Sequence, residues 1–246
     1  MKYAIIGGTG FEKPFLYSKK ISVQTPYGKT EILEPKDKNY YFLSRHGEKH
    51  SIAPHKINYR ANIWALKELG VEYIYGLCAV GSIQEKYQPG SILLLKDFLD
   101  FTKSRISTFY DGEKLPLKHL EMTDPYSPIL NHEFQQAFPR TIEEAIYVAT
   151  EGPRFETAAE IKLFSLIGGD VVGMTNVPEV ILARELEIEY AAICTVTNLC
   201  TGLVKYVSEE SINSTKTLNH NLILETIDSI FSKKSLLDKR SISNFC

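Results

Sequence analysis

The stretch Tyr73–Ser82, which reads YIYGLCAVGS, contains the pattern from which we predict the fold. Its first part, Tyr73–Ala79, is apolar and unbroken and predicts a strand, and the small residues Val80-Gly81-Ser82 follow at once. A strand of a parallel sheet is covered on both faces, so its sequence is a continuous apolar run rather than an alternation. The stretch therefore predicts a buried strand that ends in a loop of small residues.

The same pattern recurs along the chain, with helical stretches between the strands. Strands and the loops after them are expected at Tyr3–Ile6 before Gly7-Gly8-Thr9-Gly10, Tyr40–Ser44 before Arg45-His46-Gly47, Val171–Gly173 before Met174-Thr175-Asn176, and Tyr190–Val196 before Thr197-Asn198. Two further strands are expected at Ser91–Phe98 and Ile146–Ala149. Helices are expected at Asn58–Leu69, Thr157–Leu166, Val177–Glu187 and Ser208–Phe231. This alternation predicts an α/β fold around a largely parallel or mixed sheet.

The composition fits one globular domain over residues 1–246, with a polar tail from about residue 232. The chain carries 28 Lys and Arg against 30 Asp and Glu, a formal net charge of −2. Such a balance disfavours a general nucleic-acid binder, which needs a basic face. The apolar run after Met1 is too short for a signal peptide, and no window approaches the ~18 apolar residues of a membrane span.

The cysteines indicate reduced thiols rather than a disulfide or metal scaffold. They are Cys78, Cys194, Cys200 and Cys246, and none of them forms a C-x-x-C pair or has the spacing of a zinc site. We therefore expect no metal and a cytoplasmic location.

The loops after the strands form the candidate site, because ligands of open α/β sheets bind beyond the carboxyl ends of the strands. These loops contain glycines, which let backbone N–H groups approach an anion, the hydroxyls of Thr9 and Thr175, and the polar heads of Arg45 and His46. If the loops converge, they form a phosphate or sulfate site. The Gly-Gly-Thr-Gly loop alone also fits a tight turn, and it lacks the third glycine of a dinucleotide-binding motif.

Several longer motifs surround these loops. They are Arg45-His46-Gly47, the decapeptide NYRANIWALK at residues 58–67, Ala79-Val80-Gly81-Ser82, Gln88-Pro89-Gly90, the heptapeptide EGPRFET at 151–157, and the heptapeptide GMTNVPE at 173–179. In this order they resemble the trimeric purine nucleoside phosphorylase family, most closely the branch that includes methylthioadenosine phosphorylase. The resemblance runs from Met1 to about Thr226.

The resemblance implies an enzyme in which inorganic phosphate attacks the anomeric carbon of a purine nucleoside. The products are a free purine and a sugar 1-phosphate. It also implies a nucleoside phosphorylase fold, in which the mixed, twisted sheet of a single domain closes partly into a barrel between helices. It implies a homotrimer, no metal and no cofactor, since phosphate is a co-substrate.

The resemblance also assigns residues to the phosphate and to the sugar. By this transfer, phosphate is held by Thr9, Arg45, His46, the backbone of Ala79, and Thr175. Met174 packs under the sugar and Phe155 stacks on the base. Cys78 departs from the family, because the methylthioadenosine branch often has a threonine there and one hydroxyl donor is missing here.

The base-binding positions favour 6-oxopurines. The family's methylthioadenosine branch carries aspartates after the last strand, whereas this chain has Asn198-Leu199-Cys200, and it has Glu156 where the 6-oxopurine enzymes place a glutamate. An ionised Glu156 accepts the N1 hydrogen of a 6-oxopurine, and Asn198 donates to O6 or N7 as the base leaves. We therefore expect inosine, guanosine or 5′-methylthioinosine as substrate, with Asn198, Glu156 and His46 as catalytic residues and Cys200 at the base. Taken singly, Glu156 also fits a helix-starting acid and Asn198 a turn residue.

The position that lines the 5′ end of the sugar is less well defined. An ungapped count from Asn198 puts Ser211 at this position, where the 6-oxopurine enzymes have a histidine and the methylthio enzymes a small apolar residue, and a shift by one residue gives Ile212. His119 lies in the loop with which the family reaches into a neighbouring subunit's site. Ribose and 5-methylthioribose both remain open.

Three alternatives compete with phosphorolysis of 6-oxopurine nucleosides. One is a true methylthioadenosine phosphorylase with an altered loop. Another is a non-catalytic nucleoside-binding protein or phosphate sensor, which would not need phosphate and Met174 at the same anomeric carbon. The third, a dinucleotide-dependent reductase, is disfavoured by the missing glycine.

Overall fold

The computed structural model describes residues 2–11, 15, 18–207, 212, 214–215 and 217–233. Within this part of the chain, a nine-stranded mixed sheet has the order β2-β3-β4-β1-β5-β8-β7-β6-β9. The strands are β1 (Lys2–Gly7), β2 (Ser18–Thr25), β3 (Gly28–Pro35), β4 (Tyr40–Ser44), β5 (Val71–Ser82), β6 (Ile92–Phe101), β7 (Glu143–Thr150), β8 (Val171–Gly173) and β9 (Glu189–Leu199). The helices are α1 (Tyr59–Glu68), α2 (Pro128–Ala137), α3 (Ala158–Leu166), α4 (Asn176–Glu185) and α6 (His220–Ser232), with a short 3-10 turn, η1, at Pro54–Lys56.

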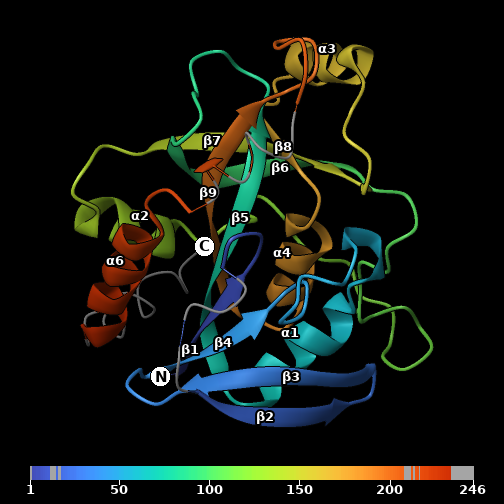
Figure 1. Ribbon diagram of the computed structural model, residues 1–246. Helices are drawn as coiled ribbons and strands as arrows, with labels where there is room; N and C mark the ends of the chain where they lie inside the picture. Colours follow the sequence, from blue (N-terminus) through green and yellow to red (C-terminus); the bar gives the residue numbers. More distant parts are fainter. Residues whose placement is uncertain are drawn as a thin grey trace.

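Half of this sheet closes into a barrel. β5 and β9 pair in parallel from Tyr73 and Glu189 to Ser82 and Leu199, which joins β9 back to the strand from which β8, β7 and β6 extend. Figure 1 shows β5 and β9 side by side through the middle of the molecule, with β1 and β4 continuing the sheet below them. The prediction of an α/β fold whose mixed sheet closes partly on itself is therefore confirmed.

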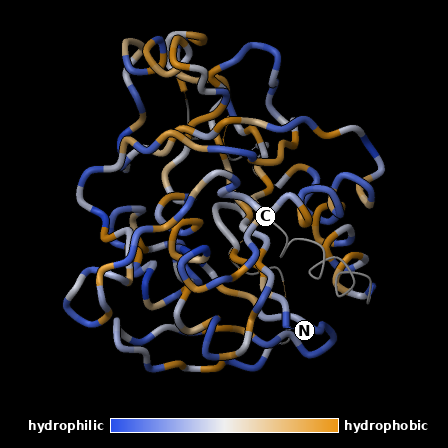
Figure 2. The backbone as a smooth tube through the Cα atoms, turned by 180° about the vertical axis from the view of Figure 1, so that it is seen from behind, coloured by the Kyte–Doolittle hydropathy of each residue, from blue (hydrophilic) through white to orange (hydrophobic). Residues whose placement is uncertain are grey.

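Helices cover the sheet in two pairs. α1 packs against α4 on one side, and α2 packs against α6 on the other (Figure 1). Figure 2 shows hydrophobic segments gathered in the central strands and hydrophilic segments in the outer loops. The strands β5 and β9 are buried over nearly their whole length, as their continuous apolar sequences predict.

Most of the expected elements are present, with small shifts at their ends. Thr157 is the N-cap of α3, and it forms a capping box with Glu160. The expected single helix over Ser208–Phe231 is wrong, because residues 217–219 form a turn and Asn219 has φ 65°. A helix cannot continue through a left-handed residue, so α6 begins only at His220; Ser208 lies outside the described residues.

One hairpin of two strands and one helix were not expected. β2 and β3 form an antiparallel hairpin whose turn uses Gly28 at φ 126°. α2 begins after the N-cap Ser127, whose side chain accepts a hydrogen bond from the backbone N–H of Leu130, with Pro128 in the first turn. The loop at residues 102–127, which precedes α2, bears on the site. No helix in the described ranges is both long and apolar enough to cross a bilayer.

Candidate functional site

A cavity of about 470 Å³ lies where the carboxyl-terminal parts of β5 and β9 meet the segments that follow β1, β4, β7, β8 and β9. It brings together side chains from most of the chain's length, and ten of the residues that the sequence predicts for the site line it. They are Thr9, Arg45, His46, Ala79, Phe155, Glu156, Met174, Thr175, Asn198 and Cys200. Their roles in binding stay predictions, but the convergence of the loops is a finding.

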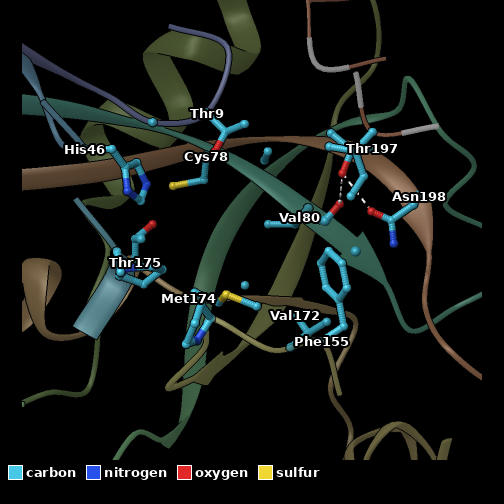
Figure 3. A pocket seen from close by; sticks show the side chains of 18 of the residues that line it. Thr9, His46, Cys78, Val80, Phe155, Val172, Met174, Thr175, Thr197 and Asn198 are labelled. Carbon is cyan, nitrogen blue, oxygen red and sulfur yellow. Dashed lines mark hydrogen bonds between the residues drawn. The ribbon is translucent and has the colours of Figure 1, made fainter. Parts of the chain in front are cut away.

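The cavity has two ends of different chemistry. In Figure 3, Thr9, His46, Cys78 and Thr175 lie together at one end. Thr197, Asn198 and Phe155 lie at the other end, with the Phe155 ring directed toward Asn198. Met174 and Val172 line the floor between the two groups. The arrangement matches a ligand that has an anion at one end and a flat, hydrogen-bonding ring at the other.

Arg45 is held inside the protein by a carboxylate. Its side chain is fully buried, and its Nε and Nη2 donate to Oε2 and Oε1 of Glu179 at 2.8 and 2.6 Å. Nη1 donates to the carbonyl of Leu77 at 2.9 Å, so three of the five guanidinium N–H donors are used within the protein. Burial disfavours the cation, but the charge of Glu179 outweighs it and holds the pKa of Arg45 well above its usual value.

Two further residues contact the Arg45–Glu179 pair. The Tyr190 hydroxyl donates to Glu179 Oε1 at 2.5 Å, which gives this carboxylate a third hydrogen bond. Gly8 lies against the guanidinium, because a Cβ at this position would be 2.5 Å from Arg45 Nη1. The glycine of the first loop is therefore needed for the close approach of Arg45 rather than for a positive φ.

His46 has a defined tautomer. Its Nδ1 lies 2.8 Å from the carbonyl oxygen of Ile52, which can only accept, so Nδ1 carries the hydrogen. The ring also packs against His50, with centroids 4.5 Å apart. In the neutral state the acceptor of His46 is then Nε2, and it becomes a donor only when the ring is protonated.

Thr175 sits at the N-cap of α4, but its hydroxyl makes no cap hydrogen bond. The backbone N–H groups of Thr175 and Asn176 instead donate to the Tyr147 hydroxyl, at 3.1 and 3.4 Å. Tyr147 can reach this place because Gly173 has no Cβ, which would lie 2.6 Å from its oxygen. The Thr175 side chain is thereby left to face the cavity (Figure 3).

Glu156 is buried at the base end and is held in position by its neighbours. The Thr150 hydroxyl donates to Glu156 Oε1 at 2.7 Å. Burial raises the pKa of Glu156 above its ordinary value, and the Thr150 hydrogen bond offsets only part of that effect. Burial and the nearby charge of Glu156 likewise raise the pKa of the Cys200 thiol, which makes Cys200 a neutral lining group.

Arg105 ties the backbone around Glu156 to the rest of the protein. Its Nη2 donates to the carbonyls of Thr150 and Glu151 at 3.1 and 2.8 Å, and its Nη1 donates to the carbonyl of Val177 at 2.6 Å. The Arg105 side chain is 2% exposed. It therefore joins the loop after β7 to the first turn of α4, although it does not line the cavity.

The amide of Asn198 has a determined orientation. The atom 3.1 Å from the Leu199 carbonyl must be Nδ2, because that carbonyl can only accept. Oδ1 then accepts from the Thr197 hydroxyl at 2.9 Å, and the same hydroxyl also donates to the carbonyl of Val80 at 3.2 Å, so these two acceptors share its one hydrogen. Nδ2 keeps its second hydrogen for a ligand in the cavity.

The structure does not bring every predicted residue to the cavity. His119 is exposed in the loop 102–127 and does not line the cavity of its own chain. Ser211 lies outside the described residues, whereas its neighbour Ile212 lines the cavity together with Val207. Within the described ranges, no group of three or more His, Cys, Asp and Glu side chains is placed to hold a metal ion.

Sequence reasoning missed three residues that organise the site. Glu179 lies within the motif at residues 173–179, which marked the region but not the partner of Arg45. Tyr147 lies in an expected strand, where an aromatic residue signals only core packing. Arg105 lies in an irregular loop, and no local pattern in the sequence distinguishes it.

A family model and the relatives found by sequence comparison agree on one family. The model of the phosphorylase superfamily matches residues 2–228. A Methanopyrus kandleri protein named probable S-methyl-5′-thioinosine phosphorylase is 51% identical over 206 residues, which cover 81% of this chain and 79% of that protein. The 6-oxopurine nucleoside phosphorylase of Pyrococcus furiosus is 45% identical over 250 residues, covering 95% and 88%.

The fold also matches that of a solved structure. The methylthioadenosine phosphorylase of Schistosoma mansoni in complex with adenine superimposes with a TM-score of 0.86 at 32% identity. The match covers 95% of this chain and 93% of that chain.

Proposed function

Because this chain belongs to the phosphorylase superfamily, we propose that it is a purine nucleoside phosphorylase that cleaves 6-oxopurine nucleosides with inorganic phosphate. The products are the free purine and ribose 1-phosphate or 5-methylthioribose 1-phosphate. The observation that carries this proposal is the placement of Glu156 and Asn198 at one end of the cavity and of Thr9, Arg45 and Thr175 at the other. The relatives named for 6-oxopurine and methylthioinosine substrates support the same conclusion.

The phosphate end acts through directed hydrogen bonds more than through net charge. Glu179 balances the charge of Arg45, so the guanidinium attracts phosphate with its two remaining N–H donors. The hydroxyls of Thr9 and Thr175 and the backbone of Ala79 supply further donors. Neutral His46 has its acceptor at Nε2, so it suits the O–H of a protonated phosphate and holds that proton away from the attacking oxygen.

The base end selects purines by the hydrogen at N1. A 6-oxopurine has an N1–H that the ionised Glu156 accepts, whereas adenine presents a lone pair there. A buried group left without its hydrogen bond costs about 1–3 kcal/mol, and more when it is charged. Asn198 Nδ2 donates to N7 or O6, and Phe155, whose side chain is 46% exposed, stacks on the ring.

The reaction follows from the two ends acting on one bond. As the glycosidic bond lengthens, positive charge grows on the sugar and negative charge on the purine. The phosphate held by Arg45 lies against the sugar cation, while Asn198 and Glu156 stabilise the departing base. A phosphate oxygen forms the new bond to the anomeric carbon as the bond to the purine N9 breaks, and the departing purine takes up at N7 or N9, through solvent, the proton that the phosphate gives up. Positioning and electrostatics account for the rate, with no covalent enzyme intermediate.

A substrate panel tests this function. Inosine, guanosine, 5′-methylthioinosine and 5′-methylthioadenosine are each incubated with and without phosphate after removal of metals with a chelator. Phosphate-dependent release of hypoxanthine or guanine is expected, and faster release of adenine from methylthioadenosine would favour the methylthioadenosine phosphorylases, the kind of protein found among the solved relatives. Binding without release in every arm would favour a nucleoside-binding protein.

The sugar and the assembly are further parts of the proposal. The apolar side chains of Ile212 and Val207 at the cavity support a 5-methylthio group, for which methylthioinosine in the same panel is the test. We also propose a cytoplasmic homotrimer in which His119 of one subunit approaches a neighbouring site. The exposed apolar side chains Leu163, Leu166 and Ile167 at α3 support association, and light scattering of the purified protein measures the mass.

A further inference from the structure

Two cysteines lie next to each other at the phosphate end of the cavity. Cys78 on β5 and Cys194 on β9 are direct partners in the parallel register, and their thiols are hydrogen-bonded to each other. Neighbouring strands are about 4.8 Å apart, which lies within the Cα–Cα range of about 4.4–6.8 Å seen in disulfides. Cys78 lines the cavity and is 4% exposed, whereas Cys194 is fully buried.

The surroundings of this pair distinguish the two sulfurs. The Cys194 thiol donates to Cys78, the Arg45 charge is nearby, and Asn176 Nδ2 donates to Cys78 Sγ at 2.7 Å. Together these lower the pKa of Cys78, although burial and the Glu179 carboxylate act against them. Burial and the role of donor to Cys78 raise the pKa of Cys194. Cys78 is therefore the nucleophilic thiol, and Cys194 keeps its proton.

We propose that Cys78 and Cys194 form an oxidation site at which small hydroperoxides convert the thiol pair into a disulfide and thereby disable the phosphate end of the cavity. The proposal goes beyond phosphorolysis, because it concerns the chemistry of the two sulfurs. A cavity of about 470 Å³ is many times the ~30 Å³ that a water molecule occupies, so it admits such an oxidant to Cys78.

The oxidation takes two balanced steps. The Cys78 thiolate attacks the hydroperoxide, an S–O bond forms as the O–O bond breaks, and the alkoxide or hydroxide released takes a proton from water. The Cys194 thiol then attacks the sulfenic sulfur of Cys78, an S–S bond forms as the S–O bond breaks, and hydroxide leaves with the thiol proton as water. The two thiols lose two electrons, and the hydroperoxide gains them.

The disulfide is expected to weaken phosphate binding by moving the backbone of β5. Disulfide Cβ atoms are about 3.8 Å apart, less than the ~4.8 Å between neighbouring strands, so the bond is expected to draw β5 toward β9 where Cys78 precedes Ala79. The same change removes the acceptor of the Asn176 amide at the start of α4, beside Thr175. Oxidation is therefore expected to raise KM for phosphate more than KM for the nucleoside, and bound phosphate is expected to protect Cys78.

Peptide mapping of the full-length wild-type protein tests the proposal directly. The reduced protein is treated with hydrogen peroxide or tert-butyl hydroperoxide, with and without saturating phosphate, and digested without reduction. The expected result is a linked Cys78–Cys194 peptide that forms more slowly with phosphate and is lost with dithiothreitol. A map in which Cys78 stays reduced, or in which Cys200 is oxidised first, overturns the proposal.

Variants separate the two steps. Cys194→Ser is expected to stop at a Cys78 sulfenic acid that dimedone labels, and Cys78→Ser is expected to leave Cys194 reduced. Cys200→Ser is the matched control, because its thiol also lines the cavity and it should still form the Cys78–Cys194 bond. Because the map requires no nucleoside turnover, it remains informative even if the proposed phosphorolysis fails; loss of the linked peptide in Cys200→Ser contradicts the proposal.

Discussion

The Arg45 guanidinium and the Glu179 carboxylate form a two-point ion pair in the core, with N···O distances of 2.8 and 2.6 Å. Glu179 is 1% exposed, and Arg45 is fully buried. Because a buried pair of this kind balances its own charge, it acts on the site mainly by fixing the orientation of the guanidinium. The pair fixes the plane of the guanidinium of Arg45, which lines the cavity.

Breaking this pair on one side is expected to destabilise the protein strongly. In Glu179→Gln the Arg45 charge stays buried without its counter-charge, and we expect a loss of about 3–5 kcal/mol in the free energy of unfolding. In the double variant Arg45→Met, Glu179→Leu no buried charge remains, and most of this stability should return. Urea denaturation of Arg45→Met, Glu179→Leu and their double variant measures the coupling.

Phosphate binding and activity provide the control for these stability measurements. The double variant should be folded but should have lost affinity for phosphate, measured as KM for phosphate or by isothermal titration with phosphate alone. If the double variant is no more stable than Glu179→Gln, the pair does not act as described. If it binds phosphate like the wild type, Arg45 is not a phosphate ligand.

Glu156→Gln is expected to relax the choice of base. A Gln side chain can keep the hydrogen bond from Thr150 at Oε1 and turn its NH₂ group toward N1, where it suits the lone pair of adenine. We expect kcat/KM for inosine to fall by about 10-fold to 100-fold, the equivalent of about 1–3 kcal/mol, while that for adenosine or methylthioadenosine holds or rises. Competition between the two nucleosides in one reaction gives the ratio. An unchanged ratio would mean that Glu156 does not read N1.

The pH dependence of this position follows from its raised pKa. Because burial favours the neutral acid, the folded protein binds this proton more tightly than the unfolded chain, whose pKa lies near 4.5. Stability from Glu156 is therefore present at low pH and is lost as the pH rises through the folded pKa. Glu156→Gln should thus raise Tm at neutral pH, with the gain vanishing below about pH 4.5. The activity of the wild type on inosine should fall as the pH drops through the same folded pKa, and a gain in Tm that is independent of pH would contradict the assignment.

The sequence predicts which residues meet at the cavity better than it predicts the residues that hold them in place. Apolar runs followed by small polar loops were sufficient to predict that Thr9 and Arg45 would meet, because the carboxyl ends of the neighbouring parallel strands β1 and β4 share an edge. The same rule does not account for Thr175, which follows β8, because β8 runs antiparallel to β5. The partner of Arg45 could not be predicted in this way, since Glu179 is 134 residues away and reaches it only through the packing of α4. The break before α6 was missed because a left-handed Asn219 leaves no sign in an amphipathic pattern.

Arg105 is expected to act as a positioning residue for the base end. In Arg105→Met the carbonyls of Thr150 and Glu151 lose their donor, and the loop that carries Glu156 loses its tie to α4. We expect kcat/KM for the nucleoside to fall by about 10-fold to 100-fold while KM for phosphate changes little, since a small misplacement of a catalytic group is costly. Steady-state kinetics with each substrate varied in turn measures the split. Arg105→Lys, which can keep one of the hydrogen bonds, should recover part of the loss, and an equal effect on both KM values would indicate a general loss of structure.

Thr197→Val tests the orientation of the Asn198 amide, because it keeps the shape of the side chain and removes its only hydrogen-bond donor. Without that donor, Asn198 can turn Oδ1 toward the ligand, where it suits a 6-amino group. We expect kcat for inosine to fall by about 10-fold. Asn198→Ala serves for comparison, because deleting a transition-state donor typically costs about 10²-fold or more.

Asn198→Asp, whose two oxygens are equivalent, should move the preference toward 6-aminopurines with or without the Thr197 hydroxyl. The double variant Thr197→Val, Asn198→Asp is the decisive measurement. If Thr197 acts through the amide, its substitution has little further effect on that background, whereas an undiminished 10-fold loss would show that the Thr197 hydroxyl acts on the substrate itself.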